Sequence, residues 1–265
     1  MAEDVNTCVG PNFYKRFEIR GKVAVVTGAS DGIGRDLAIG LARAGCQLIL
    51  CSRREGKLLE LKQLLAREGQ TAEIFPIDIR RNEEIDGLKA FAQQMFGRVD
   101  ILVNNAGFAA TKPAWEVSED DWDAIVDTGL KGAFFCCQAL GSIMRQQGYG
   151  KIINIGSTFS RTTVPGRAVY AAVKAGIDHL TEALAVEWAA HGIRVNCVAP
   201  TAVNTPSRQD LLQGPVLEKV LSRIPLGRLA TPDDLLGAVI YLCSEASDFV
   251  TGQTLFVDGG WVAAS

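Results

Sequence analysis

Seven short runs of mainly aliphatic and β-branched residues recur along the 265-residue chain, separated by segments of helical periodicity. Each run is continuously apolar rather than alternating, which is typical of strands buried on both faces of a parallel sheet. Strands that alternate with helices predict an α/β protein with a doubly wound parallel sheet, and the length suits one domain. The runs are KVAVVT (22–27), QLILC (47–51), AEIFPI (72–77), DILVN (100–104), KIINIG (151–156), RVNCVA (194–199) and TLFVD (254–258).

Ligands of such folds bind beyond the carboxyl ends of the strands, so the segments after each run are where chemistry is expected. The first of them is TGASDGIG, 27–34. Gly28 and Gly32 would let the backbone approach a pyrophosphate, Gly34 would let helix and strand pack closely, and the following helix N-terminus would supply N–H groups. Taken alone, the motif is also compatible with a plain strand-to-helix turn.

Charge and cysteine content exclude several classes of protein. The net charge is −3 with basic residues spread along the chain, which argues against nucleic acid or an anionic membrane as partner. Seven cysteines without CxxC or Cys/His spacing predict small core residues in a reducing compartment and no metal site. The first twenty residues carry no signal-peptide core, and no apolar run approaches the ~20 residues of a membrane span, so we expect a cytoplasmic protein.

Several motifs in order extend the interpretation beyond the glycine-rich turn: NNAG (104–107), Ser157, YAAVK (170–174) and a late VDGGW. Together they resemble the short-chain dehydrogenase/reductase family, over nearly the whole chain. The resemblance implies a Rossmann-type domain with seven parallel strands, here 17–265 after an N-terminal extension, 1–16. It also implies a nicotinamide cofactor and a homotetramer, with a homodimer as the alternative.

The YAAVK motif has a chemical interpretation of its own. Tyr170 and Lys174 are four residues apart, so on a helix they share a face. An ammonium about 4 Å from a phenol oxygen favours the phenolate by roughly 4 kcal/mol at an effective dielectric of about 20, which suits proton exchange with a substrate hydroxyl. The resemblance makes Ser157 the catalytic serine. The alternative for Tyr170 and Lys174 is an incidental pair on a helix surface. The alternative for Ser157 is a serine that only hydrogen-bonds the nearby backbone, and its neighbours Thr158 and Ser160 could be confused with the catalytic serine.

The resemblance also assigns contacts to the cofactor. NNAG would line the adenosine side and brace the central strands, while residues beyond the sixth strand would meet the nicotinamide. The family usually has glycine where this chain has Thr201. The implied cofactor-binding residues are Gly28, Ser30, Asp31, Gly32, Ile33, Gly34, Ser52, Arg53, Arg54, Asp78, Ile79, Asn104, Asn105, Ala106, Gly107, Tyr170, Lys174, Pro200, Val203 and Thr205.

The end of the second strand favours NADP(H) over NAD(H). An acidic residue there would bond the adenosine ribose of NAD, but the chain has Ser52 followed by Arg53 and Arg54. A hydroxyl and guanidinium groups suit a 2′-phosphate. Asp31 in the glycine-rich turn opposes this preference, although a screened surface carboxylate repels only modestly.

The substrate is less constrained. The segment 201–229 is expected to form a lid, and the opening and tail resemble gluconate 5-dehydrogenase-like and 3-oxoacyl-carrier-protein reductase-like members. We therefore expect a ketone or secondary alcohol of sugar acid, polyol or 3-oxoacyl type. Arg161, Arg167 and Arg208 could each meet a carboxylate or lie on the surface. A cofactor-binding sensor or assembly protein with little catalysis is the alternative.

Within a helical run, 122–147, the stretch VDTGLKGAFF (126–135) contains two glycines that each cost roughly 0.8–1 kcal/mol against alanine. In the family, the position 28 residues before the catalytic serine carries an asparagine whose backbone carbonyl, at a kink, anchors a water linked to the catalytic lysine. Here it is Gly129. We expect the backbone to keep this role, so that Gly129→Asn preserves or raises the rate. Gly132 is expected to allow close packing against a second copy of the helix.

Overall fold

The computed structural model describes residues 12–206 and 213–264. Its sheet has seven parallel strands in the order β3-β2-β1-β4-β5-β6-β7. This confirms the predicted doubly wound α/β fold, whose winding reverses between β1 and β4. The strands are β1 (Val23–Thr27), β2 (Gln47–Ser52), β3 (Ala72–Pro76), β4 (Ile101–Asn104), β5 (Gly150–Ile155), β6 (Ile193–Pro200) and β7 (Thr254–Val257).

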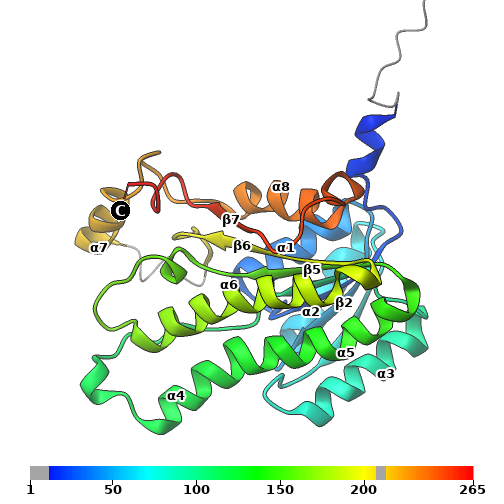
Figure 1. Cartoon of the computed structure of the whole chain (residues 1–265), viewed down its shortest axis with the longest axis horizontal. Helices are drawn as coiled ribbons and strands as arrows, with labels where there is room; N and C mark the ends of the chain where they lie inside the picture. Colours follow the sequence, from blue (N-terminus) through cyan, green and yellow to red (C-terminus); the bar gives the residue numbers. More distant parts are fainter. Residues whose placement is uncertain (1–11, 207–212, 265) are drawn as a thin grey trace, which may run out of the picture.

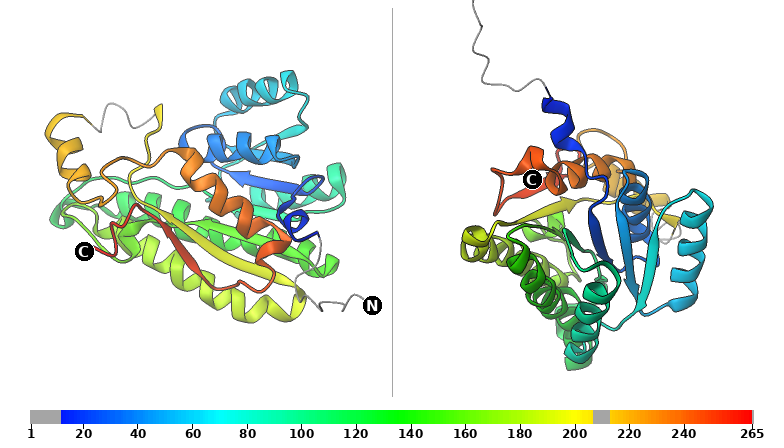
Figure 2. Two further views of the ribbon diagram at one scale, coloured as in Figure 1. Left: turned by 90° about the horizontal axis from the view of Figure 1, so that it is seen from above. Right: turned by 90° about the vertical axis from the view of Figure 1, so that its right-hand side faces the viewer.

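Helices cover both faces of the sheet (Figures 1 and 2). One face packs against α1 (Gly32–Arg43), α2 (Glu55–Arg67) and α8 (Pro232–Cys243). The other packs against α3 (Asn82–Phe96), α5 (Gly132–Gln147) and α6 (Ala168–Trp188). Because β1, β2, β4, β5 and β6 carry buried side chains toward both layers, their sequences read as continuous apolar runs.

Two shorter helices and a π-helical segment lie near the carboxyl edge of the sheet. α4 (Glu119–Val126) continues through a π-helical turn, Asp127–Lys131, into α5, so the three form one helical path alongside α6 (Figure 1). α7 (Gly214–Leu221) lies within the segment expected to be the lid. The described six cysteines, Cys46, Cys51, Cys136, Cys137, Cys197 and Cys243, are buried free thiols, as predicted.

The start of α8 shows how local sequence sets a helix boundary. Thr231 precedes Pro232 in the first turn, and its backbone N–H and hydroxyl donate to the Asp234 carboxylate at 2.7 and 3.0 Å. Arg228 bonds the same carboxylate through both terminal nitrogens, at 2.7 and 2.8 Å. These bonds cap α8 and fix where the chain returns from the segment 201–229 to the rest of the domain.

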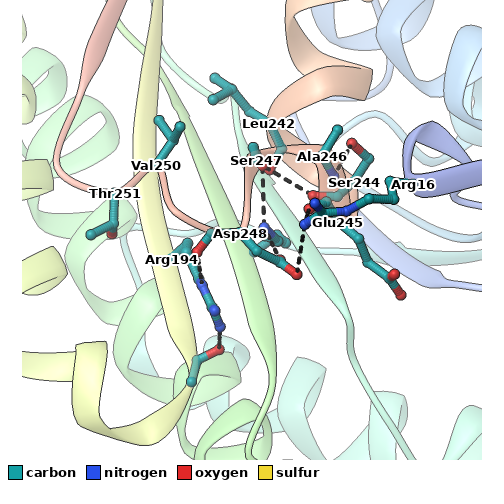
Figure 3. Close-up of polar contacts among 12 residues, drawn as sticks. Arg16, Arg194, Leu242, Ser244, Glu245, Ala246, Ser247, Asp248, Val250 and Thr251 are labelled. Atoms are coloured by element: carbon teal, nitrogen blue, oxygen red, sulfur yellow. Dashed lines mark hydrogen bonds and ion pairs between the residues drawn. The ribbon is translucent and has the colours of Figure 1, made fainter. Parts of the chain in front are cut away.

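The amino edge of the sheet, opposite the cleft described below, is closed by polar contacts (Figure 3). Arg16, in the 3₁₀ turn Phe13–Phe17, donates to the Glu245 carbonyl at 2.8 Å, and the Asp248 carboxylate accepts from the fully buried Lys151 at 2.9 Å. Arg194 donates to the Asp248 carbonyl at 3.0 Å. The described end of the expected extension, 12–16, therefore contacts the domain.

Asp100 is a buried carboxylate at the same edge, and we expect Asp100→Ala to lower the free energy of unfolding by about 2–4 kcal/mol. Asp100 is fully buried and accepts from the Val23 N–H at 2.9 Å and from Arg98 at 2.5 and 3.0 Å. The truncation leaves these donors without their acceptor. Urea unfolding measures the loss.

Asp86→Ala is the matched control, because Asp86 is exposed on α3 and its loss should change the free energy of unfolding by no more than about 0.5 kcal/mol. Asp100→Asn keeps one acceptor and should fall between the two. A loss below about 1 kcal/mol for Asp100→Ala would show that the carboxylate does not anchor the edge.

Candidate active site

A cleft of about 430 Å³ opens at the carboxyl edge of the sheet. Its walls come from the turn after β1, the ends of β2 to β6, and the first turns of α6. This is where a doubly wound sheet binds its ligands, because the winding reversal parts the connecting loops there. Eighteen of the residues assigned from sequence line it: Gly28, Ser30, Asp31, Gly32, Ile33, Ser52, Arg53, Arg54, Asp78, Ile79, Asn105, Ala106, Gly107, Ser157, Tyr170, Lys174, Pro200 and Thr205.

Glycine is required in the turn after β1. Gly28 has φ +68°, and a Cβ built on it would lie 2.8 Å from Asn105 Nδ2 and 3.0 Å from the Ala106 Cα. Asn105 Nδ2 donates to the Thr27 carbonyl at 3.1 Å, so the turn is tied to the loop after β4. The backbone thus forms an open cradle in front of the α1 N-terminus. A cradle of this kind fits the pyrophosphate of a dinucleotide.

The two asparagines of NNAG have different places. Asn105 lines the cleft, whereas Asn104 is buried and donates to Asn154 Oδ1 at 3.1 Å. Asn154 in turn donates to Thr181 Oγ1 on α6 at 2.9 Å. Asn104 therefore links β4, β5 and α6, which is the bracing expected of it, and contributes no wall to the cleft.

The proposed catalytic groups meet at the end of β5. Lys174 is 7 % exposed, and its ammonium donates to the Ile155 carbonyl at 2.5 Å and lies 5.6 Å from the centroid of the Tyr170 ring. Ser157 Oγ accepts from the Phe159 N–H at 3.2 Å, and the Phe159 ring meets Tyr170 edge-on at 6.1 Å. The Ser157 hydroxyl, the Tyr170 phenol and the Lys174 ammonium thus line one wall of the cleft.

At the adenosine end, an arginine bridges two segments of the cradle. Arg54 donates to Ser30 Oγ at 2.9 and 3.1 Å and pairs with Asp31 at 3.2 Å. The Asp31 carboxylate also accepts from the Gly32 N–H at 2.7 Å and so caps α1. The carboxylate that opposes NADP in the sequence is therefore partly neutralised by Arg54, and Arg53 lines the same end.

Asp78, after β3, lies at the same end of the cleft. Arg80 donates to both of its carboxylate oxygens at 2.5 to 3.0 Å. These hydrogen bonds, followed by a backbone bond from Arg80 and its charge, lower the pKa of Asp78 despite partial burial. Asp78 thus presents a carboxylate held in one orientation.

Besides Asn104, two assigned residues do not line the cleft. Gly34 is buried in α1, where an added Cβ would clash with Asn105 Nδ2 and the Gly28 carbonyl, in keeping with its predicted packing role. Val203 is buried and pairs with Ala230 in an isolated β-bridge. Arg208 lies outside the described residues.

Several lining residues were not assigned from sequence: Cys51, Ile77, Phe108, Ala109, Thr128, Ile155, Gly156 and Thr201. Many of them lie at the carboxyl ends of strands. The rule that ligands bind beyond these ends, which led to the glycine-rich turn, would have included them. Phe108 and Ala109 directly follow the NNAG motif, and Thr201 stands where the family usually has glycine. Thr128 is different, because it belongs to a π-helical turn that helical periodicity does not reveal.

The two glycines of the helical path both pack within the chain. A Cβ on Gly132 would lie 2.8 Å from the Ile79 carbonyl, so packing explains Gly132, but its neighbour is not the second copy expected from sequence. A Cβ on Gly129 would lie 2.7 Å from Val173 Cγ1. This contact reverses the expectation for Gly129→Asn, which should lower the rate because the new side chain has no room.

Across residues 12–206 and 213–264, no three histidine, cysteine or carboxylate side chains gather in a way that could hold a metal ion. None of the helices in this part of the chain is both long and apolar enough to cross a membrane.

The fold, the cradle and the Tyr–Lys wall together define a class of protein, the nicotinamide-dependent oxidoreductases. A family model described as "Enoyl-(Acyl carrier protein) reductase" matches residues 28–262. The chain belongs to the short-chain dehydrogenase/reductase family, and it is a short-chain dehydrogenase that works with a nicotinamide dinucleotide.

Three relatives show which members of the family this chain is similar to. It is 40% identical over 249 residues to a 2-dehydro-3-deoxy-D-gluconate 5-dehydrogenase from Escherichia coli, covering 93% of this chain and 98% of that protein. It is 34% identical over 250 residues to an NAD-dependent glycerol dehydrogenase from Listeria innocua, covering 94% and 97%. A crystal structure of a gluconate 5-dehydrogenase from Burkholderia cenocepacia, in complex with NADP and tartrate, superimposes with a TM-score of 0.91 at 38% identity, covering 95% and 99%.

Proposed function

We propose that the chain is an NADP(H)-dependent oxidoreductase that interconverts a ketone and a secondary alcohol on a sugar acid or a related polyol. The observation that carries the proposal is the convergence of Ser157, Tyr170 and Lys174 on one wall of a cleft whose other end is a phosphate cradle. When bound, the nicotinamide supplies or accepts the hydride.

The side chains manage the proton that accompanies the hydride. On reduction, the Tyr170 hydroxyl gives a proton to the carbonyl oxygen; on oxidation it takes one from the alcohol. The Ser157 oxygen already accepts from the Phe159 N–H, so its own hydrogen can be donated to the same substrate oxygen. The Lys174 ammonium stabilises negative charge on Tyr170 and is held in place by the Ile155 carbonyl.

The adenosine end supports NADP(H). Arg53 and Arg54 line it, and Arg54 can exchange its contacts with Ser30 for a 2′-phosphate while remaining near Asp31. The related Burkholderia protein was crystallised with NADP, whereas the Listeria relative is NAD-dependent. Preference for one nicotinamide over the other therefore depends on this end of the cleft.

The substrate end supports a polyhydroxylated molecule. Thr128, Ser157, Thr201 and Thr205 contribute to the cleft wall. Hydroxyl groups of this kind suit an oxygen-rich substrate, and relatives at 38–40% identity are named for gluconate-type sugar acids. A 3-oxoacyl thioester is the second candidate, favoured by the description of the matching family model.

A substrate panel tests this proposal. With NADPH, a 5-keto sugar acid is expected to show a kcat/KM about tenfold or more above acetoacetyl-CoA, because the hydroxyl-bearing walls would pair with sugar hydroxyls that an acyl chain lacks. Loss of NADPH absorbance gives the rates, and dihydroxyacetone serves as the polyol-type arm. A higher kcat/KM for the thioester would assign the enzyme to the 3-oxoacyl type, and no turnover of any carbonyl compound would favour a sensor.

We also propose a homotetramer, with a homodimer as the alternative, in a reducing compartment such as the cytoplasm. Three apolar side chains are exposed: Val186 on α6 by 83%, Phe249 in the turn before β7 by 104%, and Leu255 on the edge strand β7 by 40%. Contact with a second copy would remove them from water. The buried free thiols fit a reducing compartment.

A further inference from the structure

The helix that carries Tyr170 and Lys174 is held against the π-helical turn, Asp127–Lys131, by two interlocking contacts. On one side, Val173 of α6 fills the place of a side chain at Gly129, since a Cβ there would lie 2.7 Å from Val173 Cγ1. On the other, Leu130 fills the place of a side chain at Gly176, where a Cβ would lie 3.2 Å from Leu130 Cδ2. Each helix thus offers a notch to a side chain of the other.

Lys174 lies between the two notches. Val173 is its direct neighbour and is 2% exposed, and Gly176 follows two residues later. A shift of α6 along the π-helical turn would force each side chain out of its notch, and a shift away from the turn would leave both notches empty. Because packed contacts of this kind resist sliding, they set where the Lys174 ammonium and the Tyr170 ring stand relative to the end of β5.

The π-helical turn itself is held by local bonds. The Gly132 N–H bonds the Asp127 carbonyl, five residues earlier, and the Thr128 hydroxyl donates to the Ala124 carbonyl at 2.8 Å. Lys131 pairs with Asp127 at 3.3 Å. One extra residue in the helical path places Thr128 at the cleft while Gly129 faces α6. A π-helical turn maintained at this place is in keeping with a functional role.

We propose that Gly129 and Val173 are a size-matched pair of positioning residues, which together place Lys174 and Tyr170 for proton transfer. Neither residue touches the reacting atoms. Both act by setting the position of α6 along the π-helical turn and its distance from that turn. The inference deepens the proposed function and rests on it. It predicts that enlarging residue 129 harms the enzyme by displacing α6, and that shortening residue 173 makes room again.

The test is a double-substitution cycle with two readouts. Gly129→Ala alone should lower kcat by about tenfold or more, since displacement of a catalytic group by a fraction of an ångström is enough for such a loss. Val173→Ala alone should lower kcat by only a few-fold. The double variant, Gly129→Ala with Val173→Ala, should recover kcat to within about threefold of the parent, which is more active than Gly129→Ala alone.

The pH profile of kcat distinguishes positioning from loss of stability. Gly129→Ala should shift the profile, because displacement of α6 moves Lys174 and Tyr170 relative to the Ile155 carbonyl and Ser157 at the end of β5, and the double variant should return the profile to the parental position. The groups facing this pair include Asp178, one turn farther along α6 and beside Cys197, which all variants retain. A change in thermal unfolding without a shift of the pH profile would overturn the proposal.

Two controls match the substitutions. Gly237→Ala changes an exposed helical glycine of α8 with open space around it, and Leu59→Ala shortens an exposed leucine of α2. Both should leave kcat and the pH profile unchanged. If the losses of Gly129→Ala and Val173→Ala multiply in the double variant, the two residues are not a matched pair.

The Kd for NADPH, measured by its fluorescence without substrate, separates this proposal from the proposed function. Lys174 lines the cofactor cleft, so Gly129→Ala should weaken NADPH binding by a few-fold and the double variant should restore it. If the parent protein binds NADPH but turns over no carbonyl compound, the proposed function fails. A Kd that is restored in the double variant would still support the matched pair, and a Kd that is unaffected by Gly129→Ala, or left weakened in the double variant, would overturn it.

Discussion

Tyr170→Phe is expected to lower kcat by roughly 10²–10⁴-fold while leaving the Kd for NADPH within about threefold of the parent. The substitution removes one oxygen and keeps the ring, whose edge-on contact with Phe159 at 6.1 Å holds it in place. Without the phenol hydroxyl, the substrate oxygen loses the group that is proposed to give it a proton at the moment of hydride transfer. Steady-state rates with the best substrate of the panel, together with NADPH titration, measure both quantities.

Tyr14→Phe is the matched control, because Tyr14 is 85% exposed in the N-terminal 3₁₀ turn, and its hydroxyl should not affect turnover. Ser157→Ala should give a smaller loss than Tyr170→Phe, since it removes a hydrogen bond to the substrate oxygen and not the proton itself. Retention of kcat within about tenfold in Tyr170→Phe would contradict the proposed acid/base role and assign the proton transfer to another group.

The fold could be predicted from sequence because buried parallel strands have a simple signature. β1 and β5 have only buried side chains, so VAVVT and GKIINI are continuous apolar runs apart from Thr27, Lys151 and Asn154, whose polar ends have partners. The family resemblance implied the number of strands and their parallel direction. Register and helix contacts could not be predicted, because they depend on which side chains of distant segments fit together.

The site was predictable to the extent that it follows from strand ends. Residues after β1, β2 and β4 were assigned correctly to the carboxyl edge, yet sequence could not show that Asp31 caps α1 and pairs with Arg54. It also counted Val203 with the cofactor residues, although that side chain is buried against Ala230. Each of these depends on a side-chain direction that local pattern does not determine.

The glycines of the helical path show the same limit more sharply. Sequence identified Gly129 and Gly132 as costly residues that need a reason. The reasons are contacts with Val173 and Ile79, 44 and 53 residues away in the chain. A pattern along one helix reveals that space is needed, but only the neighbouring element reveals what fills it.

The second large effect is expected at the adenosine end of the cleft. Replacing both Arg53 and Arg54 by alanine should weaken NADPH binding by about 10²-fold or more and leave NADH binding within about threefold. A charge-assisted hydrogen bond contributes about 1.5–3 kcal/mol. Because both arginines are exposed, each should contribute toward the lower end of that range. Each 1.4 kcal/mol is a factor of ten in Kd, so two such bonds give about 10²-fold. Titrations with NADPH and NADH at one ionic strength measure the change.

Arg67→Ala provides the control for loss of positive charge, since Arg67 is exposed on α2 outside the cleft lining. Asp31→Asn tests the same site in the opposite direction. Asparagine can still cap α1, but it removes the carboxylate that pairs with Arg54 at 3.2 Å, so NADPH should bind about threefold more tightly. If the parent binds NADH more tightly than NADPH, or if the double arginine variant weakens both nucleotides equally, these arginines do not select the 2′-phosphate, because a selective contact must lose affinity only for the nucleotide that carries it.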